Sequence, residues 1–449
     1  MNKNLTIIMT VVIIAIVAIA GFVTYSMLQT PSSIRKLRLV WAETDPNTVE
    51  SMAAIIKDFE AANPNVIVQP EYVAWGDLST KMYSAVRAGS EPELMGAEIQ
   101  LMMDFAKNDI ILPLDDLVES IGKSDFYSGV LSQMLYGDHY YGLLSQVADD
   151  VIFYRKDWFA AAGISVPTNW ETWLAAVKAL TNADHYGIGF SGKAYWMQFH
   201  LMCLFRTAQG RCWTTDLDPT INTTDMYYAL SMLKELTKYC PPGWETWAHQ
   251  DRAIAFAQGQ IAMVPGQGRW LSIFEKYGPS IADPSKIGVF RWPVSGGWNG
   301  SKAGQQYAYM DTDPMWVIPK NCKYPDLAKA FLKYLMTGKE YINYAQSVPG
   351  HLNPVLKSVR NNPDYWSSST TLTTWKNEIT FMLDAVDEGV SWDISKETPN
   401  EINPYMGKIM GAMILDDLGI NVAVKGNDIQ KEMDLAQKRA LDIYSTLPK

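Results

Sequence analysis

Paired carboxylates are the residues of this sequence with the clearest capacity for chemistry, because glycoside hydrolysis needs two acids several ångströms apart. Asp149 and Asp150 are adjacent, and adjacent side chains in a strand point to opposite faces of the sheet. Asp311 and Asp313 could share one face, but a polar turn before the apolar segment MWVIP explains them equally well. Hydrolysis is therefore unsupported, and we do not predict an enzyme.

Other catalytic motifs are incomplete or missing. Gly187-x-x-x-x-Gly192-Lys193 resembles a phosphate-binding loop, but Ala194 stands where a Ser or Thr would hold Mg²⁺. The sequence contains neither G-x-S-x-G nor H-E-x-x-H, and its cysteines have no histidine at metal-ligand spacing. Only five histidines are present, and we interpret them as structural, with His351 the one most expected to face a cleft. We predict no nucleotide, metal or cofactor.

Ligand binding asks for less than catalysis: rings for stacking and a few fixed hydrogen-bonding groups. The chain has 16 Trp and 23 Tyr among 449 residues, and core packing must account for most of them. A share on a cleft wall would suit sugars, whose apolar C–H faces pack on aromatic rings. The charge balance, 38 Lys and Arg against 48 Asp and Glu with scattered basic residues, argues against a nucleic-acid partner.

The stretch Tyr140–Ile164 is the element around which we expect such a site to form. Gly142 and a polar break precede the β-branched and aromatic run Val151–Tyr154, which suits a buried strand. Asp157 is predicted to cap a short helix that Gly163 ends. A strand, a carboxylate pair and a capped helix indicate a crossover between two lobes, beside a cleft.

An alternating rhythm of strands and helices precedes that stretch. Leu37–Ala42 is a predicted strand, Asp45 or Asn47 can cap a following helix, and Val66–Tyr72 alternates as a second strand. A helix over Leu78–Ala88 and another apolar segment complete a β-α-β-α-β pattern. This order indicates a parallel sheet with binding loops at the strand ends.

Several segments resemble the extracellular solute-binding proteins of ABC importers, in particular the sugar-binding group of maltose-binding type. They are FYRKDWF, the run FEAANPNVIVQPEYVAWGDLSTKMYSAVRAGSEPEL, the segment FAQGQIAM, and the helix PDLAKAFLKYLM at Pro325–Met336. A strand over Tyr186–Phe190 and C-terminal helices that return to the second lobe fit the same pattern. The resemblance covers nearly all of residues 37–449. Glu93 departs from the aspartate that the family has after the proline at this point.

The resemblance implies an α/β, two-lobed periplasmic-binding-protein-like fold, with a mixed sheet flanked by helices in each lobe. The lobes would close by hinge motion at crossovers near residues 146 and 313. The expected division is an N-terminal apolar helix at 1–30, a linker at 31–36, lobe 1 at 37–145 with 313–365, and lobe 2 at 146–312 with 366–449.

The resemblance also implies a receptor that captures a sugar, with an oligosaccharide as first choice, and delivers it to an ABC transporter permease. Its expected ligand-binding residues are Trp75, Glu98, Gln100, Gln146, Asp149, Tyr195, Trp196, Gln267, Trp270, Asp313, Trp316, His351 and Tyr405. The alternatives are a receptor for a peptide or another polar solute, and a surface-filament subunit built on the N-terminal apolar helix. A secreted hydrolase comes third.

Location depends on the N-terminus. Leu5–Leu28 carries no charge and is long enough to span a bilayer, which predicts a membrane anchor. Ala18-Ile19-Ala20 offers a cleavage site, so a removed signal peptide is the alternative. Both place the domain outside the cell. No cysteine lies near this segment for lipid attachment, and anchored receptors of this kind resemble archaeal members of the family.

The four cysteines are Cys203, Cys212, Cys240 and Cys322. An extracellular location permits disulfides, and the first three fall close together in sequence. We therefore expect a disulfide among Cys203, Cys212 and Cys240, with buried free thiols as the alternative.

Overall fold

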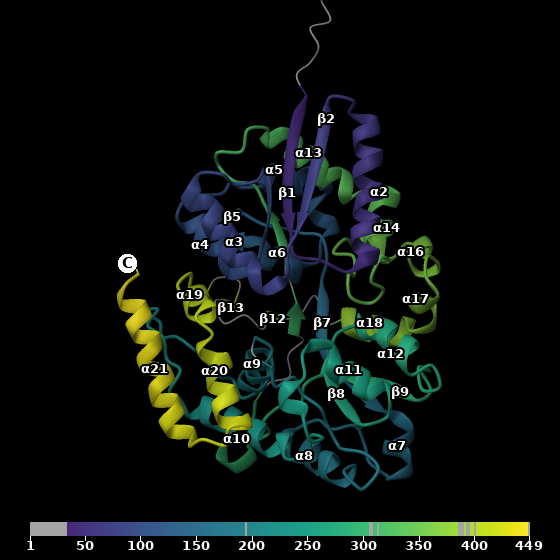
Figure 1. Ribbon diagram of the computed structural model, residues 1–449, viewed down its shortest axis with the longest axis vertical. Helices are drawn as coiled ribbons and strands as arrows, with labels where there is room; N and C mark the ends of the chain where they lie inside the picture. Colours follow the sequence, from purple (N-terminus) through teal and green to yellow (C-terminus); the bar gives the residue numbers. More distant parts are fainter. Residues whose placement is uncertain are drawn as a thin grey trace, which may run out of the picture.

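The computed structural model describes residues 34–193, 195–304, 309–311, 314–384, 390–391, 396–398 and 401–447. Figure 1 shows two sheets covered by helices, one above the other, with strand β7 (Ala148–Arg155) between them. The apolar helix expected at 1–30 lies outside the described residues, as do Ala194 and Asp313. Among the described helices, none is both long and apolar enough to cross a membrane.

The first sheet, with its covering helices, is called lobe 1 here. Its strand order is β2-β1-β3-β11-β6; β1 runs parallel to β2 and β3, whereas β11 is antiparallel to β3 and β6. The predicted parallel β-α-β-α-β start is confirmed. The elements are β1 (Arg35–Trp41), α2 (Pro46–Ala62), β2 (Val66–Tyr72), α3 (Trp75–Ala88), β3 (Leu94–Ala97), α4 (Ile99–Lys107), α5 (Asp115–Ile121), α6 (Ser128–Met134), β4 (Leu135–Tyr136), β5 (His139–Tyr140), β6 (Leu143–Leu144), β11 (Met315–Val317), α13 (Pro325–Leu335) and α14 (Gly338–Ala345).

Local sequence explains the first strand and helix. Asp45 caps α2, because its carboxylate accepts a hydrogen bond from the backbone N–H of Asn47 at 2.9 Å, as predicted. The buried residues of α2 recur at helical spacing and pack on the sheet. Glu93 reaches across to β1, where its carboxylate accepts from the backbone N–H of Arg38 at 2.9 Å and from the Arg38 guanidinium at 3.0 Å. The glutamate thus ties the start of β3 to β1.

The second sheet and its helices form lobe 2. Strands β12, β10, β7 and β8 follow in that order, and β9 also pairs with β7. Strand β7 is antiparallel to β8, β9 and β10. The elements are β7, α7 (Lys156–Ala161), α8 (Trp170–Ala179), α9 (Met197–Thr207), α10 (Thr224–Thr237), α11 (His249–Ala257), β8 (Met263–Gly266), α12 (Trp270–Tyr277), β9 (Ile287–Phe290), β10 (Tyr309–Asp311) and β12 (Val390–Ser391).

Strand β7 is buried on both faces. Val151 and Phe153 belong to a core cluster that is continuous with lobe 1, whereas Ile152 and Tyr154 belong to the cluster inside lobe 2. Alternate side chains of a strand point to opposite faces, so one strand serves both cores. This accounts for the unbroken apolar run on which the strand prediction rested, and that prediction is confirmed.

The C-terminal part consists of short elements and three helices that pack on lobe 2. Helix α18 lies against β7, α20 against α9, and α21 against α10. The elements are α15 (Lys357–Arg360), α16 (Pro363–Ser367), α17 (Thr370–Thr374), α18 (Lys376–Asp384), β13 (Lys396–Thr398), β14 (Glu401–Ile402), α19 (Met406–Gly411), α20 (Ile414–Gly419) and α21 (Ile429–Ser445). The residue boundaries predicted for the lobes stay a prediction.

Two local predictions are wrong. Helix α7 begins at Lys156 and its N-cap is Arg155, so Asp157 lies in the first turn instead of capping. There its carboxylate pairs with the Arg155 guanidinium at 2.6 Å, a favourable place for a negative charge. Tyr186–Phe190 forms only one isolated bridge, between Tyr186 and Ile261, because its two glycines have weak strand propensity.

The expected disulfide is also wrong. Cys203, Cys212 and Cys240 are buried and Cys322 is half-buried, and none of these four described cysteines forms a disulfide. The first three pack in the lobe 2 core as small apolar residues. Burial raises the pKa of the Cys203 and Cys240 thiols, which keeps them neutral and unreactive.

Candidate ligand-binding cleft

A cavity of about 320 Å³ lies between the lobes, and we call it the inner cavity. Its volume is near the lower end of the roughly 300–1,000 Å³ that small-molecule sites occupy, so a ligand of sugar size fits. Both lobes line it. Lobe 1 contributes Glu43, Thr44, Asp45, Pro46, Trp75, Glu98 and His351; lobe 2 contributes Asp150, Tyr195, Trp196, Phe199, His249, Gln250, Arg252, Gln267 and Arg269.

The lobe 1 wall forms where parallel strands end. Glu43 follows β1, Trp75 follows β2 and opens α3, and Glu98 follows β3 and immediately precedes α4. The carboxyl ends of parallel strands meet at one edge of a sheet, which is where ligands bind in open α/β sheets. The fold therefore brings these side chains together from segments more than twenty residues apart.

An ion pair joins the lobes at the inner cavity. Arg269 Nη2 lies 2.7 Å from Glu43 Oε2, and the Glu43 side chain is only 1% exposed. Glu43 Oε1 also accepts a hydrogen bond from the backbone N–H of Asp45 at 3.0 Å. Beside this pair, a Cβ on Gly268 would lie 1.8 Å from the carbonyl oxygen of Gly350. The lobes thus meet closely here, and residue 268 must be glycine for that approach.

Two histidines, the buried His351 and the half-buried His249, line the cavity in their neutral form. Burial, followed by the charge of Arg252, holds the pKa of His249 well below its usual value, and burial with Arg269 does the same to the pKa of His351. The His249 ring stacks on Trp196 with centroids 4.2 Å apart. Among the described residues, the buried Nδ1 of His351 has no hydrogen-bond partner. A neutral imidazole offers one donor and one acceptor, so His351 can bond to a ligand hydroxyl.

Arg252 is the buried cation of the lobe 2 wall. Its guanidinium lies 4.6 Å over the Trp270 ring, and its Nη2 is 3.3 Å from Nδ1 of His249. Nη1 contacts the ring of the buried His200. Burial lowers the pKa of Arg252 to about 10, and the charge of Asp150 opposes that shift. Arg252 therefore remains charged at neutral pH.

Aromatic rings face the cavity from both lobes. Tyr195, Trp196 and Phe199 form a cluster on lobe 2, with centroids 5.0 to 5.6 Å apart. Trp75 belongs to lobe 1. Rings on two sides, combined with buried charged and neutral polar groups, suit a ligand that has apolar C–H faces and many hydroxyls.

A second opening, which we call the outer groove, adjoins the inner cavity. It has a volume of about 490 Å³ and shares Trp75, Glu98, Tyr195 and Phe199 with its neighbour. The Tyr195 hydroxyl donates a hydrogen bond across the cleft to Glu98 Oε1 at 3.4 Å. The cleft therefore has two compartments with a shared wall.

The structure brings part of the predicted site together. Trp75, Glu98, Tyr195, Trp196, Gln267 and His351 line the inner cavity, and Gln100 lines the outer groove. Trp270 is fully buried behind the wall, against Arg252. Asp313 lies outside the described residues. Gln146, Asp149, Trp316 and Tyr405 are among the linings of neither compartment.

Core packing explains the placement of two residues outside the cleft. Trp316 stacks on Trp41 with centroids 3.5 Å apart and planes 8° apart, and its indole N–H donates to the Ser145 hydroxyl at 3.3 Å. Gln146 is buried, and its side-chain oxygen accepts a hydrogen bond from the Tyr344 hydroxyl. Both residues therefore pack in the interior of lobe 1, next to the crossover between the lobes.

Asp149 and Asp150 have different surroundings, because adjacent side chains of a strand point to opposite faces of the sheet. Asp149 is buried, whereas Asp150 lines the inner cavity and accepts a hydrogen bond from the indole N–H of Trp292 at 3.1 Å. The sequence indicated opposite faces but not which carboxylate faces the cavity. Tyr405 instead packs edge-on against Tyr444 and lies under the Lys107 ammonium.

Sequence reasoning also missed the ion pair at the cavity. Glu43 directly follows a predicted strand, the same signal that pointed to Trp75 and Glu98, and it could have been found that way. Arg269, His249 and Arg252 come from lobe 2 segments in which no motif or spacing marks them.

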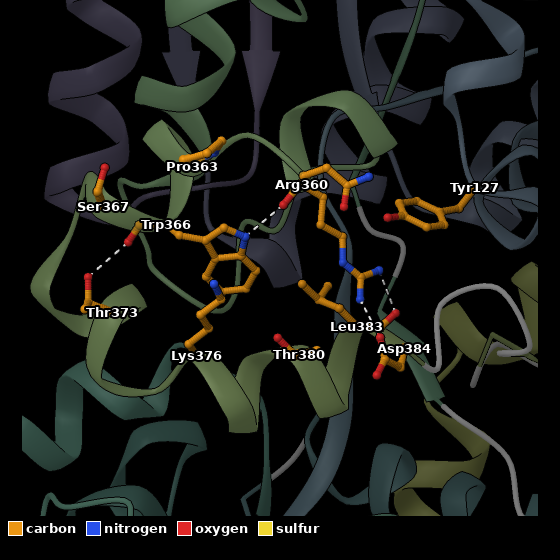
Figure 2. Close-up of a pocket in the computed structure, with 11 residues that line it drawn as sticks. Tyr127, Arg360, Pro363, Trp366, Ser367, Thr373, Lys376, Thr380, Leu383 and Asp384 are labelled. Carbon is orange, nitrogen blue, oxygen red and sulfur yellow. Dashed lines mark hydrogen bonds and ion pairs between the residues drawn. The ribbon is translucent and has the colours of Figure 1, made fainter.

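A third cavity, the C-terminal pocket, lies among α15–α18 and is larger, at about 670 Å³ (Figure 2). Figure 2 shows the Arg360 guanidinium bonded to the Leu383 carbonyl oxygen at 2.9 Å and to the Asp384 carboxylate at 3.0 Å. The indole N–H of Trp366 donates to the carbonyl oxygen of Arg360 at 2.8 Å. These polar groups bond to one another, so this pocket is the weaker candidate for a ligand.

Comparison with known proteins agrees with the geometry of the cleft. Residues 54–374 match the family described as bacterial extracellular solute-binding protein. The chain belongs to this family. A Brucella abortus chain named as a binding protein is 26% identical over 235 residues, which are 51% of this chain and 57% of that relative. The present solute-binding protein thus aligns with 57% of the length of that curated relative.

Solved solute-binding proteins share the fold. One from Agrobacterium radiobacter K84, in complex with ribitol, has a TM-score of 0.75 at 21% identity and covers 92% of this chain and 100% of its own. A sugar transporter protein from Arthrobacter chlorophenolicus A6, with bound laminaribiose, has a TM-score of 0.72 at 18% identity, covering 93% and 100%. The predicted two-lobed periplasmic-binding-protein-like fold is confirmed.

Proposed function

We propose that this solute-binding protein is the extracytoplasmic receptor for a sugar or polyol and delivers it to an ABC transporter permease. The observation that carries the proposal is the inner cavity, where rings and buried polar groups from both lobes surround a space of about 320 Å³. A sugar presents apolar C–H faces to rings and hydroxyls to fixed donors and acceptors, and this lining supplies both. Ribitol and laminaribiose in proteins of the same fold support this ligand class.

Capture would use closure of the lobes about the crossovers near residues 146 and 313. In the closed arrangement the Glu43–Arg269 pair and the Gly268–Gly350 approach seal one side of the cavity. Closure hides the ligand from water and gives the permease a surface composed of both lobes. The residues proposed for ligand contact are the predicted Trp75, Tyr195, Trp196 and His351, together with Asp150.

We place the domain on the outer side of the cytoplasmic membrane, as membership of an extracellular family implies. The uncharged stretch Leu5–Leu28 supports retention by an N-terminal anchor. Membrane fractionation and mass spectrometry of the mature N-terminus test this. An intact N-terminus in the membrane fraction is expected, and a released chain starting near residue 21 would contradict the anchor.

The function is tested by thermal shift of the full chain in mild detergent against ribitol, mannitol, maltose, laminaribiose and a set of di- and tripeptides. A ligand that binds only the folded state raises the melting temperature, since it adds about 2.7 kcal/mol of stability at a hundred times its Kd. We expect a shift with sugars or polyols, which must be recovered unchanged afterwards. A shift with peptides alone would contradict the proposal, and turnover of the sugar would indicate a hydrolase.

A further inference from the structure

Two asparagines of the chain stand in the acceptor pattern for N-linked glycosylation, Asn-x-Ser/Thr. They are Asn222, in Asn222-Thr223-Thr224, and Asn299, in Asn299-Gly300-Ser301. Such triplets also arise by chance, and an asparagine can be modified only where a transferring enzyme can reach its amide nitrogen. Both asparagines are exposed, so exposure alone does not distinguish them. The hydrogen bonds of their side chains do.

The amide group of Asn222 is occupied by hydrogen bonds to helix α21. Its Nδ2 donates to the Asp434 carboxylate at 2.6 Å, and its Oδ1 accepts from Gln430 Nε2 at 3.0 Å. The backbone N–H of Asn222 also donates to Gln437 Oε1 at 3.0 Å, on the same helix. A transferring enzyme would have to break these bonds before it could orient the amide, so this triplet is the poorer acceptor.

Asn299 lies at the tip of a short loop of lobe 2. The backbone N–H of Gly296 donates to the carbonyl oxygen of Ala303 at 2.8 Å. The backbone N–H of Gly297 donates to the carbonyl oxygen of Lys302 at 3.3 Å, so the two arms of the loop are joined below its tip. Asn299 has a φ of +50°, which asparagine tolerates better than most residues. Among the described residues, its exposed side chain has no hydrogen-bond partner.

The base of this loop is anchored on lobe 2, away from the cleft. The backbone N–H of Trp170 donates to the carbonyl oxygen of Val294 at 2.8 Å, and that of Ser295 donates to Thr207 at 3.2 Å. These bonds join the loop to the start of α8 and the end of α9. Helix α8 lies at the end of lobe 2 that is remote from lobe 1 (Figure 1). Residues 296–301 line none of the three cavities, so a group attached there would leave the cleft open.

We propose that Asn299 is a site of N-linked glycosylation and that Asn222 stays unmodified. The donor class is an oligosaccharide joined through phosphate to a membrane lipid. The amide nitrogen of Asn299 forms a bond to the anomeric carbon, the bond from that carbon to the phosphate oxygen breaks, and one amide proton is released to water. The lipid phosphate is the leaving group. The inference rests on the extracytoplasmic location in the proposed function, and it goes beyond ligand binding.

The test is mass spectrometry of tryptic peptides from the full chain, purified from the cells that make it naturally. Trypsin cleaves after Arg291 and Lys302, so Asn299 is recovered in a short peptide of residues 292–302. This peptide is expected to carry the added mass of an oligosaccharide on Asn299. Ser301→Ala keeps the asparagine but removes the hydroxyl that the acceptor pattern requires, so the modification should be lost. Ser301→Thr restores the pattern and should retain the modification.

Thr224→Ala is the matched control, because it disrupts the other triplet in the same way. The peptide with Asn222 is expected to have its unmodified mass in wild type and in this variant, while Asn299 keeps its glycan in both. An unmodified Asn299 in the wild-type chain would overturn the inference, and so would a glycan that Ser301→Ala leaves in place. A glycan on Asn222 that Thr224→Ala removes would contradict the argument from the bonds to α21.

Calorimetry separates this inference from the proposed function. Ser301→Ala is expected to keep the wild-type Kd for the sugar or polyol that the thermal-shift panel identifies, because the loop lies away from the cleft. If the wild-type chain binds such a ligand while Asn299 is unmodified, only the glycosylation is wrong. If Asn299 carries a glycan while no sugar or polyol of the panel binds, the glycosylation stands and the proposed ligand class is wrong.

Discussion

The inner cavity and the C-terminal pocket differ in the origin and bonding of their polar groups, which their volumes do not reveal. The C-terminal pocket has about 670 Å³ against about 320 Å³, yet its arginine, indole and carboxylate bond to one another within residues 360–384. The inner cavity collects carboxylates, guanidiniums, imidazoles and rings from segments of both lobes. Burying polar groups from distant segments costs free energy. Such a collection of groups therefore indicates a binding site better than a large cavity volume does.

Two arginine ion pairs, one at each cavity, sharpen this difference. Arg360 pairs with Asp384, 24 residues away, and the Asp384 side chain is 67% exposed. Arg269 pairs across the lobes with Glu43, which is almost fully buried and 226 residues distant. An exposed pair contributes about 1 kcal/mol or less, whereas breaking a buried pair costs about 3–5 kcal/mol. Breaking the ion pair at the inner cavity should therefore cost more free energy than breaking the Arg360–Asp384 pair. Because the pair at the inner cavity joins the two lobes, its loss should affect lobe closure.

The largest expected effect comes from Glu43→Leu. It leaves Arg269 buried without its carboxylate when the lobes close, and opening relieves the strain by exposing Arg269 to water. Ligand affinity should fall about 100-fold, equivalent to about 3 kcal/mol, and small-angle X-ray scattering should show a larger radius of gyration. Asp384→Ala should leave the Kd unchanged. Equal losses of affinity in the two variants would remove the distinction between the cavities.

Removal of a ring from each cavity should give the next largest difference. Trp196→Ala takes away a stacking surface of the inner cavity and should weaken sugar binding by about 2 kcal/mol, roughly 30-fold in Kd. Trp366→Ala removes the indole of the C-terminal pocket and should lower the unfolding free energy with no change in Kd. Calorimetry and urea denaturation measure the two quantities. Weaker binding in Trp366→Ala would make the larger pocket the ligand site.

The pH dependence of stability should follow the cleft, because desolvation lowers the pKa of the histidines at its wall and directly behind it. His200, His249 and His351 have folded-state pKa values below the usual 6.5, so the unfolded chain binds more protons than the folded chain below that pH. Their contribution to stability is complete above about pH 6.5 and is lost as the pH falls below it, by up to about 1.4 kcal/mol per pH unit and histidine.

Urea denaturation between pH 7.5 and 5 measures this slope. His351→Gln should make this slope shallower, because it removes one of the histidines whose pKa is lowered in the folded protein. A slope that is the same in wild type and His351→Gln would mean that this histidine carries no linkage.

The fold was largely predictable because its signals are local. Asp45 before a helical apolar stripe fixed α2, and the run Val151–Tyr154 fixed β7. For Trp75 and Glu98, which line the inner cavity, the signal was their position directly after a strand. Trp316 was predicted from its position at a crossover between the lobes, yet it stacks on Trp41 in the core. Sequence patterns do not distinguish a tryptophan at a cleft from one beneath it, because burial is decided by partners elsewhere in the chain.

The prediction of a disulfide among the cysteines was wrong for the same reason, because the packing of each side chain depends on partners elsewhere in the chain. Proximity in sequence brought Cys203, Cys212 and Cys240 to attention, but each fills its own place in the lobe 2 core. Likewise nothing near Arg269 in sequence indicates that its partner is Glu43.

The smallest expected difference concerns two residues with left-handed backbones. Tyr195 has φ +80° and Gln209, exposed at the far end of α9, has φ +59°. Glycine relieves such strain at the cost of greater freedom in the unfolded chain, so Gln209→Gly should stabilise the protein by about 0.5 kcal/mol and keep the Kd. Tyr195→Gly gains the same relief but loses ring contacts with Trp196 and Phe199, so its stability should change little.

Binding is what separates these two variants. Tyr195→Gly removes a wall of both compartments and should weaken ligand affinity about tenfold, measured by calorimetry beside Gln209→Gly. If Tyr195→Gly binds as tightly as wild type, the strain at 195 has no role in the cleft. If it binds more weakly while Gln209→Gly does not, the Tyr195 side chain contributes to ligand affinity from a strained backbone position.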